Sequence, residues 1–238
     1  MGEFLNPAFL LEIFNYLVRY VPITIGLAVG TMLLSCLLAL IITILRYNKV
    51  PLLGKLADLY VLLCRALPSM ILLYLVFFGI PILLMAFSGT AKSAMLLRNI
   101  PPIAFAVCGL TLHTGAYLAE IFRGALQSVN IGQTEAALSI GMTWSQAFFK
   151  VILPQASVFA LPLMANQFLN LLKGTSIAFM ISVMELFGAA SVLAADNNAY
   201  LEVYIVAAGL YWTTSICFEK IALRLEYNLS YFKRGANK

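Results

Sequence analysis

The segment "PITIGLAVGTMLLSCLLALIITIL", residues 22 to 45, decides the fold class of this chain. It contains no charged residue and exceeds the roughly 20 residues that one helical crossing of a bilayer needs. The segment "RYNKVPLLGK", residues 46 to 55, ends it. Of the 238 residues, 62% are hydrophobic and 11% are charged, whereas soluble domains carry about 25% charged residues. We therefore predict an all-α integral membrane protein.

Four further apolar runs extend over about residues 57 to 86, 100 to 121, 155 to 173 and 201 to 219. Together with the first run they predict five transmembrane helices. Arg65 and Pro68 interrupt the second run, which is long enough to span with slack for tilt or kinks. One stretch is ambiguous, because "GTSIAFMISVMELFGAASVLAADNN", residues 174 to 198, would add a sixth crossing if it spanned fully.

Basic residues distinguish five crossings from six. They form three clusters, after the first span, around the middle of the chain and in the tail: Arg46, Lys49 and Lys55; Arg123 and Lys150; Lys220, Arg224, Lys233, Arg234 and Lys238. With five spans all three clusters face the cytoplasm, as the positive-inside rule requires, and only Arg19, Lys92 and Arg98 lie outside. We predict five spans, an outside N-terminus and a cytoplasmic C-terminus, with residues 175 to 197 forming a re-entrant or outer-surface element.

The chain is predicted to be one membrane domain, residues 22 to 226, between an N-terminal interfacial segment, residues 1 to 21, and a basic cytoplasmic tail, residues 227 to 238. The N-terminal segment lacks the basic region of a cleaved signal peptide. The basic residues behind the net charge of +5 lie between apolar segments, which indicates topology rather than nucleic-acid binding. The four cysteines lie singly in apolar segments, so we expect core residues and no metal site.

A polar passage lies between the third and fourth spans, at about residues 122 to 154, and by topology in the cytoplasm. Its central part is "EAALSIGMTWSQAFFKVILP", residues 135 to 154. Gly141 permits a turn that joins two short helices, Thr143 is a suitable N-cap for the second, and Pro154 is expected to end it. A pair of this kind could simply connect two spans.

The order of residues in this passage resembles the EAA loop of permease subunits of ATP-binding-cassette (ABC) importers. The pattern E-A-A, three residues, G, nine residues, I-x-L-P is matched, except that "VILP" places Ile152 directly before the leucine. The resemblance implies that the passage forms coupling helices that dock in a groove of a separate ATPase, through an apolar face that includes Phe148. The residues to which it assigns this coupling function are Glu135, Ala136, Ala137, Gly141, Leu153 and Pro154.

The resemblance extends over about residues 20 to 226 and points to the polar amino-acid branch of these permeases. Three segments carry it: "AYLAEIFRGALQSVNIGQTEAALSIGM", "LLKGTSIAFMI" and "RALPSMILLYLVFFGIP". Ala66 and Leu67 stand where the branch has Gly-Thr, and Gly174 stands where it has Asp. The resemblance implies a type I importer fold in a bacterial cell membrane and a substrate of the histidine, glutamine, arginine or cystine type.

The resemblance also implies the partners. These are ABC ATPase subunits that bind ATP and magnesium, a second permease chain that is identical or related, an extracytoplasmic solute-binding protein and membrane lipid. The sequence contains no G-x-x-x-x-G-K-[ST] phosphate loop, so we expect this chain itself to bind no cofactor.

Two cations lie inside apolar segments, where an unpaired charge is costly. Arg65 lies roughly 12 Å from the inner end of the second span, and Lys173 lies near the outer end of the fourth. Each either pairs with a protein carboxylate or with backbone carbonyls, or extends to an interface, or receives the carboxylate of a transported amino acid. Asn166, Thr175 and Ser176 would add hydrogen bonds to such a substrate.

Other polar residues have structural explanations. Glu120 and Arg123 lie one helical turn apart at the inner end of the third span, so we predict an ion pair that braces the polar passage. His113, the only histidine, is expected to be a hydrogen-bonded interior residue rather than a proton relay. Glu185 could meet a substrate ammonium group, but we expect it at the surface.

Two other classes of function remain to be weighed. An intramembrane enzyme would need H-E-x-x-H, G-x-S-x-G or paired intramembrane aspartates, and the sequence contains none of these. A stand-alone secondary carrier or channel for small polar solutes is the alternative, and it would transport without an ATPase. We predict a subunit that is not an enzyme: the membrane-spanning permease of an ATP-driven amino-acid importer that works by alternating access.

Overall fold

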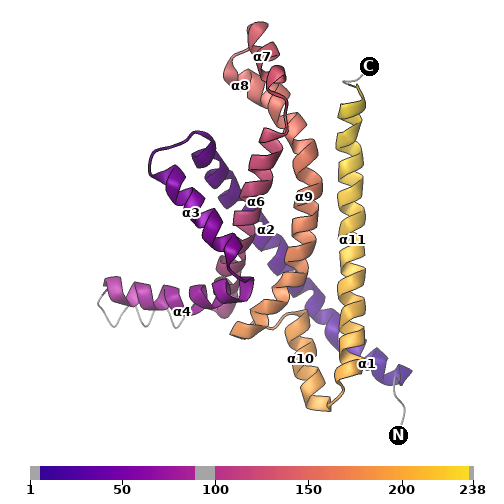
Figure 1. Cartoon of the computed structure of the whole chain (residues 1–238). Coiled ribbons are helices and arrows are strands. Elements are labelled where there is room, and N and C mark those ends of the chain that lie inside the picture. Colours follow the sequence, from indigo (N-terminus) through magenta and orange to yellow (C-terminus); the bar gives the residue numbers. More distant parts are fainter. Residues whose placement is uncertain (1–5, 89–99, 236–238) are drawn as a thin grey trace.

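The computed structural model describes residues 6 to 88 and 100 to 235 (Figure 1). Lys92 and Arg98, which we expected on the outer side of the membrane, are not among the described residues. The predicted all-α class is confirmed for the described residues, whose helices are α1 (Pro7–Leu17), α2 (Val21–Tyr47), α3 (Leu53–Ala66), α4 (Ser69–Ser88), α6 (Pro102–Gln127), α7 (Ile131–Ser139), α8 (Trp144–Ala147), α9 (Leu153–Gly174), α10 (Leu186–Asn197) and α11 (Tyr200–Gly235).

The structure confirms five crossings. Among the described residues, five helical stretches are long and apolar enough to span a bilayer: Pro7–Tyr47, Ser69–Ala86, Pro102–Gln127, Trp144–Ile181 and Tyr200–Tyr227. The start of α1 and the end of α11 lie at opposite ends of the molecule, and α7 and α8 lie at the end that holds the end of α11 (Figure 1). An odd number of crossings requires this arrangement.

The ambiguous stretch between the fourth and fifth spans does not cross. It forms a 3₁₀ turn, Thr175–Ile181, followed by α10. The 12 residues of α10 extend about 18 Å, too short for a bilayer core of about 30 Å. This helix lies at the same end of the molecule as α1 (Figure 1), where its Leu186 and Ala189 belong to a core cluster with Leu17 of α1 and Val203 of α11.

The second expected span is not the single spanning segment that we predicted from residues 57 to 86. It is divided into α3 and α4, and α4 projects sideways from the other helices (Figure 1). Leu67, between them, has an extended backbone with ψ of 139°. The physical reason is Pro68, whose ring excludes the helical conformation from the residue before it and which supplies no N–H.

Close packing of α2 on α6 forms the centre of the molecule. The buried residues of α2 are mostly small and recur about once per turn: Thr24, Ala28, Thr31, Ser35, Ala39 and Thr43. The hydroxyls of Ser35 and Thr43 donate to the carbonyl oxygens of Thr111 and Ala119 on α6. Both bonds join residues 76 positions apart, so the helices run parallel in one register. Small side chains allow this approach, and the hydroxyls stabilise it.

Glu185 is not at the surface, as we expected, but fully buried, with 0% of its area exposed. It caps α10, because its Oε1 accepts from the backbone N–H of Gly188 at 2.8 Å. The hydroxyls of Tyr211 on α11 and Thr24 on α2 donate to its Oε2 at 2.8 and 3.2 Å. Three neutral donors therefore replace the water that a surface carboxylate would have, and they join α2, α10 and α11 at one point.

Candidate coupling loop and charge network

The polar passage forms the two short helices that the sequence predicts. The first, α7, begins after Asn130, whose side chain accepts from the backbone N–H of Gly132 at 2.8 Å. Gly141 has φ of +85° and provides the turn. Thr143 then caps α8 in a reciprocal capping box with Gln146, with bonds of 3.3 and 3.0 Å. The glycine joint and the predicted N-cap are both confirmed.

The end of the second short helix differs from our expectation, because Pro154 does not end it. A π-helical turn, Phe148–Ile152, joins α8 to α9, and Pro154 lies in the first turn of α9. The first N–H groups of a helix have no partner within the helix, so a proline in the first turn loses no helical hydrogen bond. The wider π turn before it accommodates the proline ring. The passage is therefore continuous with the fourth span, and α6 extends to Gln127, beyond the predicted loop start at residue 122.

The exposed surface of this loop combines large apolar side chains with polar ones, and most of the apolar ones are not residues that the resemblance named. Glu135 and Ala136 are exposed, whereas Ala137 is buried and Phe148 is half-buried. Leu153 and Pro154 are exposed on the first turn of α9. The large apolar side chains exposed on the loop were missed: Ile131, Leu138, Ile140, Trp144 and Phe149. A signal was available, since apolar residues gain nothing on a free cytoplasmic surface and mark contact sites.

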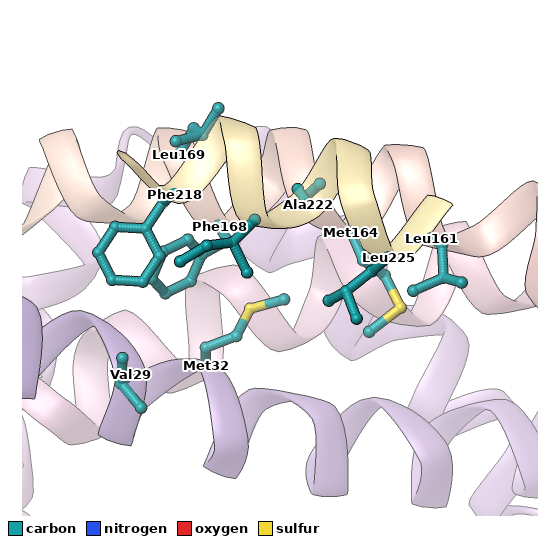
Figure 2. A pocket seen from close by; sticks show the side chains of 11 residues that line it. Val29, Met32, Leu161, Met164, Phe168, Leu169, Phe218, Ala222 and Leu225 are labelled. Carbon is teal, nitrogen blue, oxygen red and sulfur yellow. The ribbon is translucent and has the colours of Figure 1, made fainter. Parts of the chain in front are cut away.

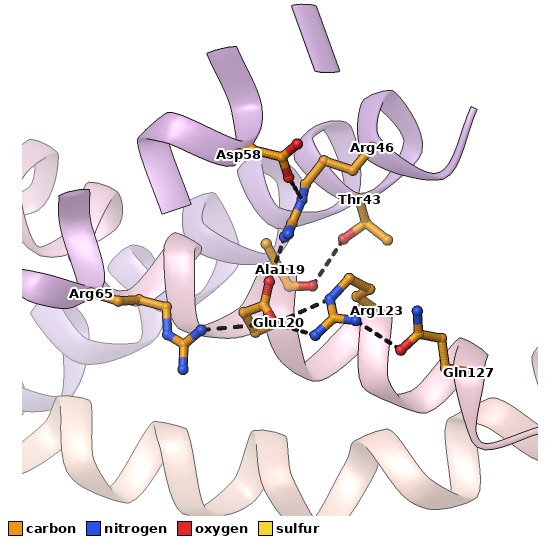
Figure 3. Close-up of polar contacts among 8 residues, drawn as sticks. All are labelled: Thr43, Arg46, Asp58, Arg65, Ala119, Glu120, Arg123 and Gln127. Atoms are coloured by element: carbon orange, nitrogen blue, oxygen red, sulfur yellow. Dashed lines mark hydrogen bonds and ion pairs between the residues drawn. The ribbon is translucent and has the colours of Figure 1, made fainter. Parts of the chain in front are cut away.

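A network of charged side chains lies behind the loop, at the inner ends of α2, α3 and α6 (Figure 3). Glu120 on α6 lies at its centre and is 18% exposed. It accepts from Arg46 of α2 at 2.5 Å and from Arg123 at 2.6 and 3.1 Å, so the predicted Glu120–Arg123 pair is present. Arg46 also donates to Asp58 of α3 at 2.6 Å, and Arg123 donates to Gln127 at 2.7 Å.

Arg65 belongs to the same network but is held more loosely. Its Nη1 lies 3.8 Å from Glu120 Oε2, beyond hydrogen-bond distance, and its guanidinium lies 5.4 Å from the ring centroid of Tyr117. The side chain is 44% exposed, and no hydrogen bond of Arg65 is found within the described part of the chain. The network contains three guanidinium groups and two carboxylates, so Arg65 retains donors for a further anion.

The other candidate substrate residues lie on or near α9, and no described contact brings them to Arg65. Asn166 and Lys173 are exposed on one side of α9. Asn170, which we missed, is exposed on the same side, since positions 166, 170 and 173 repeat at helical spacing. The hydroxyl of buried Thr175 donates to the carbonyl of Leu172, and that of Ser176 donates to the carbonyl of Lys173.

His113 lies on α6, one turn before Tyr117. The two ring centroids are 5.0 Å apart. Its Nδ1 is buried and has no hydrogen-bond partner among the described residues, but the ring makes a hydrogen bond with the backbone of Cys64, as expected of a hydrogen-bonded interior residue. The described residues contain no group of three or more His, Cys, Asp or Glu side chains that could hold a metal ion.

An apolar groove of about 260 Å³ lies between α2, α9 and α11 (Figure 2). It is lined without exception by apolar side chains: Val29, Met32, Leu161, Met164, Ala165, Phe168, Leu169, Phe218, Ile221, Ala222 and Leu225. A site for a charged amino acid needs polar groups that replace its hydration. The groove therefore does not provide the substrate site, and the polar residues of α3, α6 and α9 remain the candidates.

Comparison with known proteins supplies the context for this arrangement. A family model described as "Binding-protein-dependent transport system inner membrane component" matches residues 32 to 230. The chain is 39% identical over 210 residues to the probable amino-acid permease protein YxeN of Bacillus subtilis (strain 168), over 88% of this chain and 89% of that protein. It is 37% identical over 203 residues to the L-cystine transport system permease protein TcyL of the same organism, over 85% and 82%.

A solved structure has the same fold. The crystal structure of an amino acid ABC transporter with histidines matches with a TM-score of 0.80 and 29% identity, over 96% of this chain and 99% of that chain. The similarity therefore includes the five spans, the loop of α7 and α8, and α10 together.

Proposed function

This chain belongs to the family of inner membrane components of binding-protein-dependent transport systems, and we propose that it is the membrane-spanning permease subunit of an ATP-driven amino-acid importer. It is a multi-pass membrane protein with the type I importer permease fold. The alternative of a stand-alone carrier or channel is not favoured, because relatives over most of the chain are transport-system permeases.

The proposed importer contains this chain, a second permease chain that is identical or related, two ABC ATPase subunits and an extracytoplasmic solute-binding protein. ATP and magnesium would be bound by the ATPase subunits and not by this chain. ATP binding would draw the ATPase subunits together, and the loop of α7 and α8 would carry that movement to the spans, which alternate between outward-facing and inward-facing states.

The proposed orientation places the loop and the C-terminus in the cytoplasm and the N-terminus outside. The positive-inside rule supports it, because Arg46, Lys49, Arg123 and Lys150 lie at the end of the molecule that holds α7 and α8. The ATPase subunits would then be on the side where ATP is available.

The proposed pathway includes the exposed side of α9 that carries Asn166, Asn170 and Lys173. Amides and an ammonium group facing hydrocarbon would be costly, so a wet pathway or a second permease chain has to cover them. Lys173 or Arg65 would receive the α-carboxylate of a polar amino acid, and Ser176 would lie beside it. Thr175 would act indirectly, since its hydroxyl is buried.

One observation carries the proposed function: the two short helices joined at Gly141 expose several large apolar side chains at one end of a five-span membrane protein. The test is retention of the ATPase by the tagged chain, combined with ATP-driven uptake of labelled cystine, histidine, glutamine or arginine, each assayed separately in reconstituted vesicles. Glu135→Lys reverses the charge at the exposed loop surface and should lower both retention and uptake.

Glu12→Lys is the matched control, because it makes the same substitution at an exposed position of α1, at the opposite end of the molecule. It should leave retention of the ATPase unchanged. The proposal fails if the unmodified chain never retains an ATPase, or if Glu135→Lys and Glu12→Lys behave alike.

A further inference from the structure

The last turn of α2 directs two consecutive side chains to different parts of the inner end of the molecule. Arg46 donates to Glu120 on α6 and to Asp58 on α3 (Figure 3). Tyr47, the final residue of α2, has its ring centroid 6.3 Å from that of Trp144, the first residue of α8, with the rings tilted by 46°. One turn of helix therefore contacts both the charge network and the coupling loop.

The ring contact continues from α8 toward α9. Trp144 stacks on Phe148 with centroids 5.3 Å apart and rings 14° from parallel. Phe148 begins the π turn that leads into α9, and Ala147 beside it is fully buried. Tyr47, Trp144 and Phe148 thus form a row of rings from the end of α2, across α8, to the start of α9.

A cavity of about 580 Å³ separates Tyr47 from the other short helix, α7. The remaining lining residues come from the end of α6, the start of α7 and the π turn: Leu126, Gln127, Ser128, Val129, Asn130, Ile131, Thr134 and Ile152. Beside this space, the ring contact of Trp144 with Tyr47 joins the loop to α2. The same space leaves room for α7 to move.

The covalent chain joins the coupling loop to α6 and α9 alone, so movement of the loop reaches α2 and α3 through noncovalent contacts. We propose that Tyr47 is a positioning residue that transmits movement of the coupling loop from Trp144 to α2, and through Arg46 to Glu120 and Asp58. This inference rests on the proposed function, which assigns the loop to the ATPase. Tilted and stacked rings have preferred geometries, so displacement of one ring displaces its neighbour.

The experiment uses the complete complex with its ATPase and binding protein in lipid vesicles, and whichever of the four labelled amino acids the unmodified complex accumulates. Tyr47→Ala removes the ring, whereas Tyr47→Phe keeps it. In Tyr47→Ala we expect uptake per ATP hydrolysed to fall about two- to tenfold, the factor that one ring contact contributes to a conformational equilibrium. Tyr47→Phe should take up as much amino acid per ATP as the unmodified complex, because it keeps the ring. If the hydroxyl of Tyr47 were responsible instead, Tyr47→Phe would be impaired like Tyr47→Ala.

The experiment distinguishes failure of the inference about Tyr47 from failure of the importer assignment. If Tyr47→Ala retains the ATPase and transports as much per ATP as the unmodified complex, the inference about Tyr47 is wrong and the importer assignment stands. If the unmodified chain retains no ATPase, the importer assignment itself is wrong.

If Tyr47→Ala fails to assemble, a second measurement tests the inference. In a chain whose four cysteines are replaced by serine, Tyr47→Cys and Trp144→Cys are introduced together and joined after assembly with a short bismaleimide. The link replaces the ring contact, so we expect linked complexes to take up more amino acid per ATP than unlinked ones of the same preparation. Unchanged or lower uptake after linking overturns the inference.

Discussion

The carboxylate of Glu185 holds three donors together inside the protein, and its loss should be destabilising. In Glu185→Ala, the N–H of Gly188 and the hydroxyls of Tyr211 and Thr24 lose this acceptor in a buried place. A buried donor left unpaired costs about 1 to 3 kcal/mol, so we expect the free energy of unfolding to fall by about 3 kcal/mol or more. Glu185→Gln keeps an acceptor oxygen and should lose less. The apparent melting temperature of the purified chain in detergent measures both.

Glu12→Ala is the control for this series, because Glu12 is exposed on α1 and makes no hydrogen bond that the structure describes. Its melting temperature should match that of the unmodified chain. Equal melting temperatures for Glu185→Ala and Glu12→Ala would contradict the buried arrangement.

Glu120 and Asp58 both pair with Arg46, but their surroundings predict different effects. Glu120 is 18% exposed and binds two guanidinium groups directly, whereas Asp58 is 63% exposed. We expect Glu120→Gln to lower the free energy of unfolding by about 2 kcal/mol, and Asp58→Asn by about 0.5 kcal/mol, since solvent screens the exposed pair. Melting temperatures of the two variants, measured side by side, check the order, and the reverse order would show that Glu120 is not the centre of the network.

Residues with local partners were predictable from sequence, and residues with distant partners were not. Glu120 and Arg123 are three positions apart, so helical spacing alone predicts their pair. Glu185 meets Thr24 from 161 positions away. Nothing near Glu185 in the sequence encodes that contact, and glutamate is rarely buried, so the surface expectation followed from its residue type.

At the scale of elements, Gly141 sets the angle between α7 and α8. An added Cβ at this position would meet no atom within 4 Å, so the cost of Gly141→Ala is backbone strain at φ of +85° rather than a clash. Such strain costs about 1 to 2 kcal/mol. We expect the loop to open more often in Gly141→Ala, and amide hydrogen exchange across residues 131 to 147 to become faster.

Gly124 is the matched control, because it lies in the helical part of α6 and an added Cβ there also meets no atom within 4 Å. Gly124→Ala should leave the loop exchange unchanged and stabilise α6 by about 0.5 to 1 kcal/mol. Faster exchange in the loop of Gly124→Ala would mean that the effect is not specific to the turn.

Prolines show which element boundaries sequence reasoning can predict. Pro154 was expected to end a short helix and Pro68 only to interrupt a single span, yet only Pro68 separates two helices. The residue before Pro68 has room to adopt an extended backbone at the edge of α4. Pro154 instead follows a π turn that is packed inside the loop through Ile152, and tertiary packing of that kind is not encoded in the local pattern.

At the scale of the whole molecule, the number of crossings was predictable because charge and hydropathy are summed over many residues. The packing of α2 on α6 was not foreseen in the same way. The small residues of α2 were visible in the first segment, but their partners on α6 lie about 76 positions later, and one sequence does not identify which helix a small-residue face will meet.

Five and six crossings predict different patterns of cysteine labelling from the two sides of the membrane. Single cysteines in a cysteine-free chain are treated with a membrane-impermeant maleimide, in sealed vesicles of known orientation and after permeabilisation. Ser145→Cys in α8 should react only from the cytoplasmic side, and Asn197→Cys at the end of α10 only from the outside. A cysteine appended after Lys238 should react from the same side as Ser145→Cys, because one further crossing, α11, follows α10. Six crossings would instead put the appended cysteine opposite Ser145→Cys, since residues 175 to 197 would then return the chain to the cytoplasm before the last span.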